Sequence, residues 1–184
     1  GHYPLKGLHI VLEALPAILN KYPDSRLVVS GVNIMRGRSP FDCILRSGYA
    51  KYLATIIRKN RLWNKVFFIG EIDAEGIKSN MLTSNVFLCA SSIENSPNSV
   101  CEAQMLGVPC IASDVGGIRS IIPDNSCGRL YEYDSPMALA NQVCVSFDES
   151  SQYDSSEEMS LAATRHNKLN ILDTMMSIYE QVAY

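Results

Sequence analysis

The sequence predicts an α/β domain built on a doubly wound, Rossmann-like parallel sheet. Short apolar runs at 26–31, 66–70, 86–90 and 110–112 alternate with segments of helical periodicity, which is typical of βαβ units. The last two runs are unbroken, as expected for strands buried on both faces of a parallel sheet. A chain of 184 residues can form one such domain with a sizeable core, but not two. We therefore expect a single domain over 1–184.

Composition and charge exclude several classes of function. The net charge of −3 favours no polybasic surface for nucleic acid. No apolar run approaches the roughly 18 residues of a membrane span, and no signal peptide is visible. The cysteines show no C-x-x-C pair and no metal spacing with the histidines, so we expect small core residues in a reducing cytosol. They are Cys43, Cys89, Cys101, Cys110, Cys127 and Cys144.

The chemistry of the chain lies between the third and fourth apolar runs. Ser96 is a good N-cap and Pro97 suits the first helical position, while Gly107 and Pro109 end the predicted helix. The distance between these start and stop signals predicts a short helix of about ten residues. Its free N–H groups should point into the crevice where open parallel sheets bind ligands.

The start of this helix is a predicted phosphate site. Its first free amides belong to Asn98 and Ser99, because Pro97 has none. Glu102 follows one turn later, and its carboxylate could reach a hydroxyl-bearing group such as a ribose. The helix is apolar nearly all round, so we expect Glu102 to be buried and to need a ligand partner. Alternatively, Glu102 binds no ligand and is there only because the positive end of the helix dipole stabilises a negative charge.

The elements before this unit alternate as the fold class requires. Helical periodicity begins at Leu8, and we expect the first strand of the domain to lie before residue 1. Lys6, at the turn into this helix, is either placed to stabilise a departing phosphate or an ordinary solvated lysine. Residues 26–31 should form a buried strand that ends in glycine. A helix over 49–60, a strand over 66–70 and a short helix over 74–83 follow.

Two polar segments supply further candidate ligands. Residues 32–48 should form a loop over the mouth of the crevice, in which Arg36 and Arg38 are phosphate ligands or plain surface residues. The DVGG turn after the fourth run contains Gly116 and Gly117, which permit a close approach of backbone to ligand. An ordinary strand-to-helix turn would explain the same glycines.

The C-terminal part should add one strand and three helices. In the last helix an apolar stripe of Leu169, Leu172, Met176 and Tyr179 is predicted. Residues 155–184 are therefore expected to close the domain. The predicted ranges are 128–132 for the strand, 136–145, 157–166 and 168–182 for the helices, and 148–158 for a solvated loop.

The spacing of two glutamates carries a resemblance to a known family. Glu94 and Glu102 are separated by seven residues within SSIENSPNSVCEAQMLGVPCIAS, which DVGG follows. This stretch resembles the E-x7-E region of the family-4 glycosyltransferases, and the surrounding S-x-x-E, E-A-x-x-x-G-x-P-x-I-A-S and V-G-G make the match specific. The resemblance covers nearly the whole chain but only the second half of such an enzyme. It implies the donor-binding, C-terminal half of a GT-B fold, in an enzyme that transfers sugar from a nucleotide diphosphate with retention.

The resemblance also implies a role for each candidate residue. Glu94 would contact hydroxyls of the transferred sugar and Lys6 would neutralise the leaving diphosphate, so these two are the predicted catalytic residues. Glu102 would hold the ribose hydroxyls, while Asn98 and Ser99 would offer amides to phosphate. These roles suit a transition state in which negative charge collects on the diphosphate.

The remaining contacts to the donor would come from backbone. Gly70 and Ile72 would lie near the nucleotide base, and Gly116 and Gly117 near the donor. Ser120 stands where the family commonly has a glutamate, which weakens the expected contact between this turn and the donor sugar.

The resemblance further implies the partners. No Asp-x-Asp motif stands near the candidate residues, so we expect no metal and no cofactor, with a UDP- or GDP-sugar as donor. A glycan or lipid-linked acceptor would bind an N-terminal domain outside this chain, in polysaccharide or glycoconjugate synthesis in the cytoplasm, with peripheral association at the inner membrane face. The isolated chain should bind nucleotide weakly and turn over nothing. The alternative is a non-catalytic nucleotide-binding or protein-interaction domain, which the Ser120 departure favours.

Overall fold

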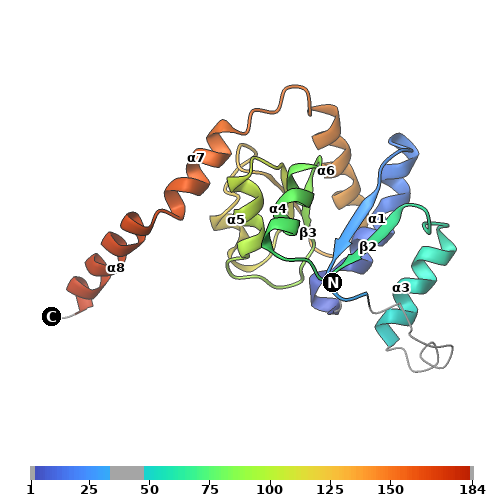
Figure 1. The fold of residues 1–184 in the computed structure, drawn as a ribbon, viewed down its shortest axis with the longest axis horizontal. Coiled ribbons are helices and arrows are strands. Elements are labelled where there is room, and N and C mark those ends of the chain that lie inside the picture. Colours follow the sequence, from blue (N-terminus) through green and yellow to red (C-terminus); the bar gives the residue numbers. More distant parts are fainter. Residues whose placement is uncertain (1–2, 34–47, 183–184) are drawn as a thin grey trace.

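The computed structural model describes residues 3–33 and 48–182, which alternate helices and strands in the predicted order (Figure 1). The predicted elements are confirmed within a few residues at their ends. The predicted loop with Arg36, Arg38 and Cys43 lies outside the described residues. The elements are η1 (Pro4–Lys6), α1 (Leu8–Lys21), β1 (Leu27–Ser30), α3 (Gly48–Lys59), β2 (Val66–Gly70), α4 (Ala74–Leu82), β3 (Phe87–Cys89), α5 (Asn98–Met105), β4 (Cys110–Ser113), η2 (Gly116–Ser120), β5 (Arg129–Tyr131), α6 (Pro136–Asp148), α7 (Ser156–Arg165) and α8 (Lys168–Val182).

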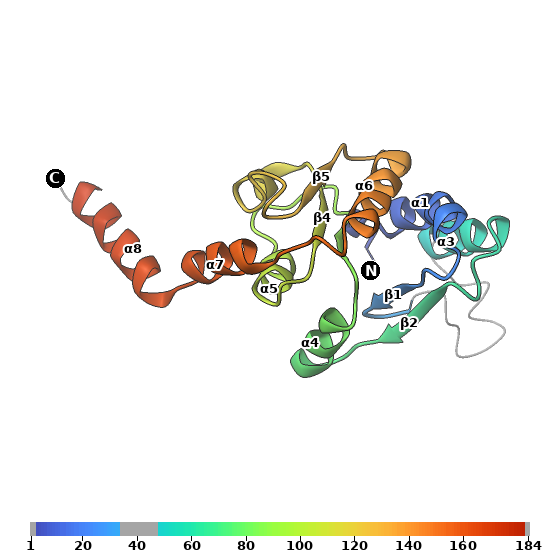
Figure 2. The same ribbon diagram turned by 90° about the horizontal axis from the view of Figure 1, so that it is seen from above.

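All strand pairs are parallel, as the α/β prediction requires, but they belong to two sheets (Figure 2). β1 pairs with β2, while β4 lies between β3 and β5. Among the described residues β1 and β3 form no strand pair with each other. Residues 26–30 and 86–91 instead line one cleft between the two sheets.

The position of this cleft agrees with the expected strand before residue 1. η1 is tied to the carboxyl end of β3, since Ser92 N–H donates to the Leu5 carbonyl over 2.8 Å. From there α1 leads to β1. A helix that ends in a parallel strand is normally preceded by a neighbouring strand, in a right-handed crossover. The gap between β1 and β3 is where such a strand would lie, and its presence stays a prediction.

β1 is only half buried, so the prediction of a buried strand over 26–31 is wrong. Leu27 and Val29 pack with residues of α1 and α3, whereas Val28 is 46% exposed. Its neighbour on β2, Phe67, is also exposed. The reason is that α1 and α3 cover one face of the β1–β2 sheet and leave the other open.

The β3–β4–β5 sheet carries helices on both faces. Ile111 of β4 packs with α1 and α6, and Ala112 packs with α5 and η2. All four residues of β4 are buried, as its apolar run predicts. The same prediction is wrong for β3, where Phe87 and Leu88 are only partly buried because they face the cleft. The expected core placement of the cysteines is confirmed for Cys89, Cys101, Cys110 and Cys127, which are free and buried, and Cys144 is partly buried.

The two C-terminal helices differ in how they pack. α7 lies against α5, and α8 projects away from the body of the domain in both views (Figures 1 and 2). α8 has no buried residue, and its predicted apolar stripe is exposed. α7 therefore closes this part of the domain without help from α8. In the described ranges, no helix combines the length and apolarity needed to cross a membrane.

Candidate functional site

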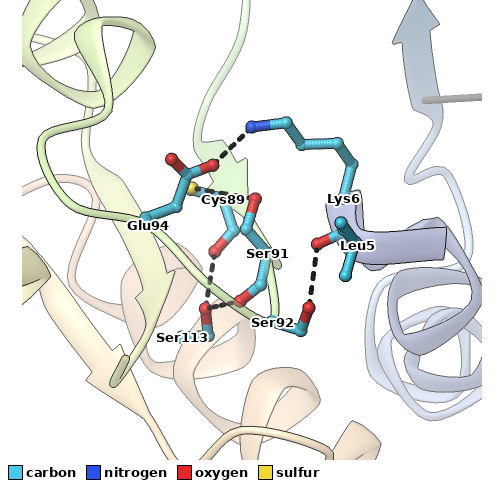
Figure 3. A network of polar contacts seen from close by, with 7 residues as sticks. All are labelled: Leu5, Lys6, Cys89, Ser91, Ser92, Glu94 and Ser113. Atoms are coloured by element: carbon cyan, nitrogen blue, oxygen red, sulfur yellow. Dashed lines mark hydrogen bonds and ion pairs between the residues drawn. The ribbon is translucent and has the colours of Figure 1, made fainter. Parts of the chain in front are cut away.

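The loop that follows β3 is held in place by a buried serine. Ser113, the last residue of β4, is fully buried, and its hydroxyl donates to the Ser91 carbonyl over 2.5 Å (Figure 3). Ser91 is itself 2% exposed. Burial raises the pKa of the neighbouring Cys89 thiol, so this thiol stays protonated near neutral pH. The result is a rigid start for the loop that carries Glu94.

Gly7 brings η1 against the same strand end. Gly7 has a φ of 68°, and a β-carbon there would lie 1.8 Å from the Ala90 carbonyl oxygen. Only glycine allows both the backbone conformation and the close contact. The Ser92 amide and its hydroxyl both donate to the Leu5 carbonyl, the hydroxyl over 3.4 Å (Figure 3), and these bonds fix the other side of this contact. Lys6 is thereby placed at the carboxyl end of β3.

The two predicted catalytic residues contact each other. Lys6 Nζ lies 2.5 Å from Glu94 Oε1 (Figure 3). The Glu94 side chain is 14% exposed, and that of Lys6 is 56% exposed. The carboxylate is thus largely shielded while the ammonium group stays accessible to solvent. Residues far apart in the sequence therefore form one charged pair beside the cleft.

Gly116 and Gly117 approach the backbone of the Glu94 loop. A β-carbon on Gly116 would lie 2.0 Å from the Glu94 carbonyl oxygen, and one on Gly117 would lie 2.0 Å from that of Asn95. The Gly117 amide also donates to the Glu94 carbonyl over 3.1 Å. The close approach predicted for a ligand is therefore made, in this structure, by the protein's own chain.

α5 begins at Asn98, which corrects the predicted cap. Pro97 occupies the N-cap position and no side chain caps the helix, so the prediction that Ser96 caps it is wrong. The amides of Val100 and Cys101 bond to the Pro97 carbonyl. The amides of Asn98 and Ser99 precede the first intrahelical bonds and bond to no acceptor in the described part of the chain. They remain donors for an anion.

Glu102 is exposed, so the argument from its burial is wrong. α5 buries Val100, Cys101, Ala103 and Gln104, and this face packs into the core. Ser99 and Glu102 are three positions apart and share the opposite face. The helix is therefore amphipathic, and no desolvation cost requires a partner for Glu102. The role of Glu102 therefore depends on its position on the cleft and not on its burial.

Several of the predicted site residues lie on the cleft between the two sheets, whose volume of about 1080 Å³ includes the gap between β1 and β3. They are Lys6, Glu94, Ser99, Glu102 and Ile72. Cationic, anionic and amide donor groups therefore line one common space. Such a set suits a ligand that combines phosphate with hydroxyl groups.

Four predicted residues do not line this cleft: Asn98, Gly70, Gly116 and Gly117. Asn98 is exposed at the start of α5, so only its amide has a predicted role. Gly70 ends β2, where its carbonyl accepts from the Gly31 amide over 2.7 Å. Ser120, at the position of the family's glutamate, donates its hydroxyl to the Gly117 carbonyl over 2.6 Å. That bond completes the turn locally.

Sequence reasoning missed the residues that hold the loop, Ser91 and Ser113. The available signal was weak: each is a serine that directly follows or ends an apolar strand. A buried hydroxyl at a strand end needs an acceptor, but the sequence does not identify the acceptor. The sequence likewise indicated no role for Gly7.

Together these features define a class of protein: an α/β domain with parallel strands, in which charged and polar groups gather where a cleft reaches the carboxyl end of β3. The sequence profile of the family described as "Glycosyl transferases group 1" matches residues 2–161. This chain therefore belongs to the group 1 glycosyltransferases.

Known proteins share this fold and sequence pattern. The chain is 27% identical to phosphatidyl-myo-inositol mannosyltransferase of Mycobacterium tuberculosis over an alignment that spans 100% of this chain and 46% of that protein. A structure of HepE from Anabaena with UDP superposes with a TM-score of 0.77 at 22% identity, covering 98% of this chain and 46% of HepE. The chain thus spans about half the length of the curated relatives it matches.

A third comparison is with an isolated domain. The C-terminal domain of a group 1 glycosyltransferase (LpcC) from Francisella tularensis has a TM-score of 0.71 at 25% identity, covering 90% of this chain and 82% of that one. The α/β fold expected for the second half of a GT-B enzyme agrees with these structures.

Proposed function

We propose that this chain is the donor-binding half of a family-4, retaining glycosyltransferase, which transfers a hexose from a UDP- or GDP-sugar to an acceptor hydroxyl. The observation that carries this proposal is the single cleft lined by Lys6, Glu94, Ser99 and Glu102 beside the uncapped start of α5. Amide donors and a cation suit a diphosphate, and the carboxylates suit sugar and ribose hydroxyls.

In this proposal the amides and Lys6 act on the charge that develops on the diphosphate, and the two glutamates bind hydroxyl groups of the donor. The Asn98 and Ser99 amides and Lys6 stabilise the negative charge on the leaving diphosphate. Glu102, one turn along α5, accepts from the ribose hydroxyls, and Glu94 accepts from hydroxyls of the transferred sugar. Glu94 is not a covalent nucleophile in this scheme, because the second carboxylate serves the nucleotide instead of a two-carboxylate hydrolytic mechanism.

The Lys6–Glu94 pair suggests how the site receives its donor. Lys6 is more than half exposed, so its flexible side chain can exchange the carboxylate for a phosphate at little cost. That exchange releases Glu94 to bind the sugar. The base would lie near Gly70 and Ile72, and Gly116 and Gly117 would support the donor through the Glu94 loop that they contact.

The relatives suggest the wider reaction. HepE was solved with UDP, so UDP is the first nucleotide to test. The mycobacterial relative is named for mannosyl transfer to a phosphatidylinositol, which favours a lipid-linked or glycan acceptor, in glycoconjugate or polysaccharide synthesis. In this proposal the reaction needs no metal or cofactor. The acceptor binds the other half of the full-length protein, in the cytoplasm or peripherally at the inner membrane face, and the isolated chain turns over nothing.

Substitution of Glu102 tests the proposal. In the full-length protein, Glu102→Gln should lower sugar transfer and UDP affinity, with turnover reduced on the order of a hundredfold. Glu75→Gln is the matched control, since Glu75 is an exposed glutamate that pairs only with Lys78 on α4. Normal transfer by Glu102→Gln would contradict the assigned role.

The same assay decides the alternative function, a non-catalytic domain that keeps the fold. The local bond of Ser120 to Gly117, in place of the family's glutamate, is the observation that favours this alternative. If this alternative is right, wild-type full-length protein transfers no sugar from any nucleotide donor. Glu102→Gln should then leave binding of its partner unaffected.

A further inference from the structure

The buried face of α5 contains a polar side chain with several hydrogen bonds. Gln104 is 1% exposed. Its Nε2 donates to the Cys127 carbonyl over 2.7 Å and to the Ile121 carbonyl over 3.2 Å. Its Oε1 accepts from Arg165 Nη1 over 3.1 Å. A buried amide with both donors used is tightly fixed in position and orientation.

Arg165, the last residue of α7, completes this arrangement. Its Nη2 donates to the Ile121 carbonyl over 3.1 Å, the same carbonyl that Gln104 contacts. The planar guanidinium thus bridges a side chain of α5 and the backbone that follows η2. Three segments, α5, the 121–127 loop and α7, meet at these two side chains.

The rest of α7 also packs against the end of α5. A β-carbon on Gly107 would lie 2.7 Å from Ser155 Oγ and 2.9 Å from Met159 Sδ. Glu158 of α7 is fully buried. α7 and α5 lie side by side in both views (Figures 1 and 2). The two ends of α7 therefore both contact the C-terminal end of α5 and the residues that follow it.

The position of Gln104 ties this contact to the cleft. Gln104 is two residues after Glu102, so the two side chains lie about 200° apart around the helix axis. It is also about 9 Å along the axis from Asn98. A helix of eight residues moves as one body, so a rotation at Gln104 redirects Glu102 and a tilt displaces the first amides.

We propose that Gln104 and Arg165 are positioning residues for the nucleotide site, through which the docking of α7 sets the orientation of α5. This inference rests on the proposed function, because it assumes that the start of α5 and Glu102 hold the nucleotide. It predicts that nucleotide affinity depends on a helix that does not itself line the cleft.

The test uses Gln104→Met and Arg165→Met in the full-length protein. Methionine keeps much of the volume and removes the hydrogen bonds. Each variant should weaken UDP binding, measured by calorimetry, about tenfold. The double variant should be little worse than either single one, because both break the same arrangement. Arg165→Lys should restore affinity only in part, since lysine cannot bond both acceptors with one planar group.

The control separates positioning from general destabilisation. Val143→Ala removes buried volume from α6, in a core cluster that does not include α5. Its thermal midpoint should fall as in the test variants, with UDP affinity unchanged. Hydrogen exchange gives a readout without ligand: the amides of α5 should exchange faster in Arg165→Met than in Val143→Ala.

The outcomes are distinguishable. If wild-type protein binds UDP and the folded variants bind it within twofold, with α5 exchange unchanged, the positioning role is wrong while the proposed function stands. If wild-type protein binds no nucleoside diphosphate, the proposed function is wrong. In that case faster α5 exchange in Arg165→Met would still confirm that α7 sets the position of α5, and unchanged exchange would reject it.

Discussion

The carbonyl oxygen of Ala90 occupies the space in which any residue other than Gly7 would have its β-carbon. This contact, together with a positive φ, decides where Lys6 lies relative to β3. The position of the cation at the cleft therefore depends on the absence of a side chain in the next residue. The same holds on the opposite side, where Gly116 and Gly117 contact the Glu94 loop.

Gly7→Ala should destabilise the protein by at least about 2 kcal/mol, because it adds a clash to a left-handed backbone. Urea unfolding measures the change. Gly48→Ala is the control, since no atom of the described residues beyond its own helix and chain neighbours lies within 4 Å of a β-carbon there, and its effect should stay within about 0.5 kcal/mol. Equal stability of the two variants would mean that the Gly7 contact is not maintained in solution.

The Lys6–Glu94 pair should matter more for activity than for stability. With Lys6 more than half exposed, loss of the pair in Lys6→Gln or Glu94→Gln should cost less than about 1 kcal/mol of unfolding free energy. In the full-length protein both should lower kcat/KM for sugar transfer on the order of a hundredfold. Lys78→Gln breaks a comparable surface pair on α4 and should leave kcat/KM unchanged. A purely structural pair would give the reverse result, with stability lost and activity kept.

At the scale of elements, α7 carries a buried acid. Glu158 is fully buried, its Oε2 accepts from the Tyr153 hydroxyl, and its Oε1 has no hydrogen-bond partner among the described residues. Burial raises the pKa of Glu158 to about 7, although the hydrogen bond from Tyr153 and the Cys110 thiol lower it. Neither Tyr153 nor Cys110 carries a positive charge that would offset this burial, so Glu158 is more easily buried as a neutral acid.

This acid should make stability depend on pH. Its folded pKa lies above the unfolded value of 4.5, so its contribution is fully present below that value and is lost as pH rises through about 7. The loss should reach up to about 3 kcal/mol. Wild-type protein should therefore unfold at lower urea at pH 8 than at pH 5, and Glu158→Gln should reduce the difference. Glu157→Gln, at the exposed neighbouring position, should not. An equal pH dependence in all three proteins would exclude this role for Glu158.

The cleft between the two sheets gives a second prediction about elements. The Leu27 and Phe87 amides donate toward the paired neighbours of β1 and β3, so the next amides, of Val28 and Leu88, face the gap. If a strand before residue 1 fills the gap in the full-length protein, these two amides should exchange with solvent as slowly as those of Val29 and Cys89. Rapid exchange at Val28 and Leu88 would show that the gap stays open.

For the whole molecule, the reaction should be independent of metal. The proposed stabilisation of the leaving diphosphate comes from Lys6 and the α5 amides, which need no divalent ion. Full-length protein treated with EDTA and assayed in chelator should keep its rate of sugar transfer. A large loss that magnesium or manganese restores would assign part of this role to a metal.

Local sequence patterns were sufficient to predict much of the architecture. The unbroken apolar run that became β4 and the periodicity that became α1 are properties of neighbouring residues, so they can be recognised without a partner. The contact of Gly7 with Ala90 could not, because it joins segments far apart in the chain. Burial was misjudged at β1 and Glu102 for the same reason: composition shows that a residue is apolar or flanked by apolar residues, but not which face is covered.

The sequence by itself determined the α/β class, the order of the elements and the membership in a glycosyltransferase family, because periodicity and motif spacing are local. Only the tertiary structure decided that Lys6 pairs with Glu94, that the paired glycines hold the Glu94 loop, and that Gln104 and Arg165 join α7 to α5. These features depend on distances between residues that are remote in sequence, and such distances exist only after the helices and strands have packed.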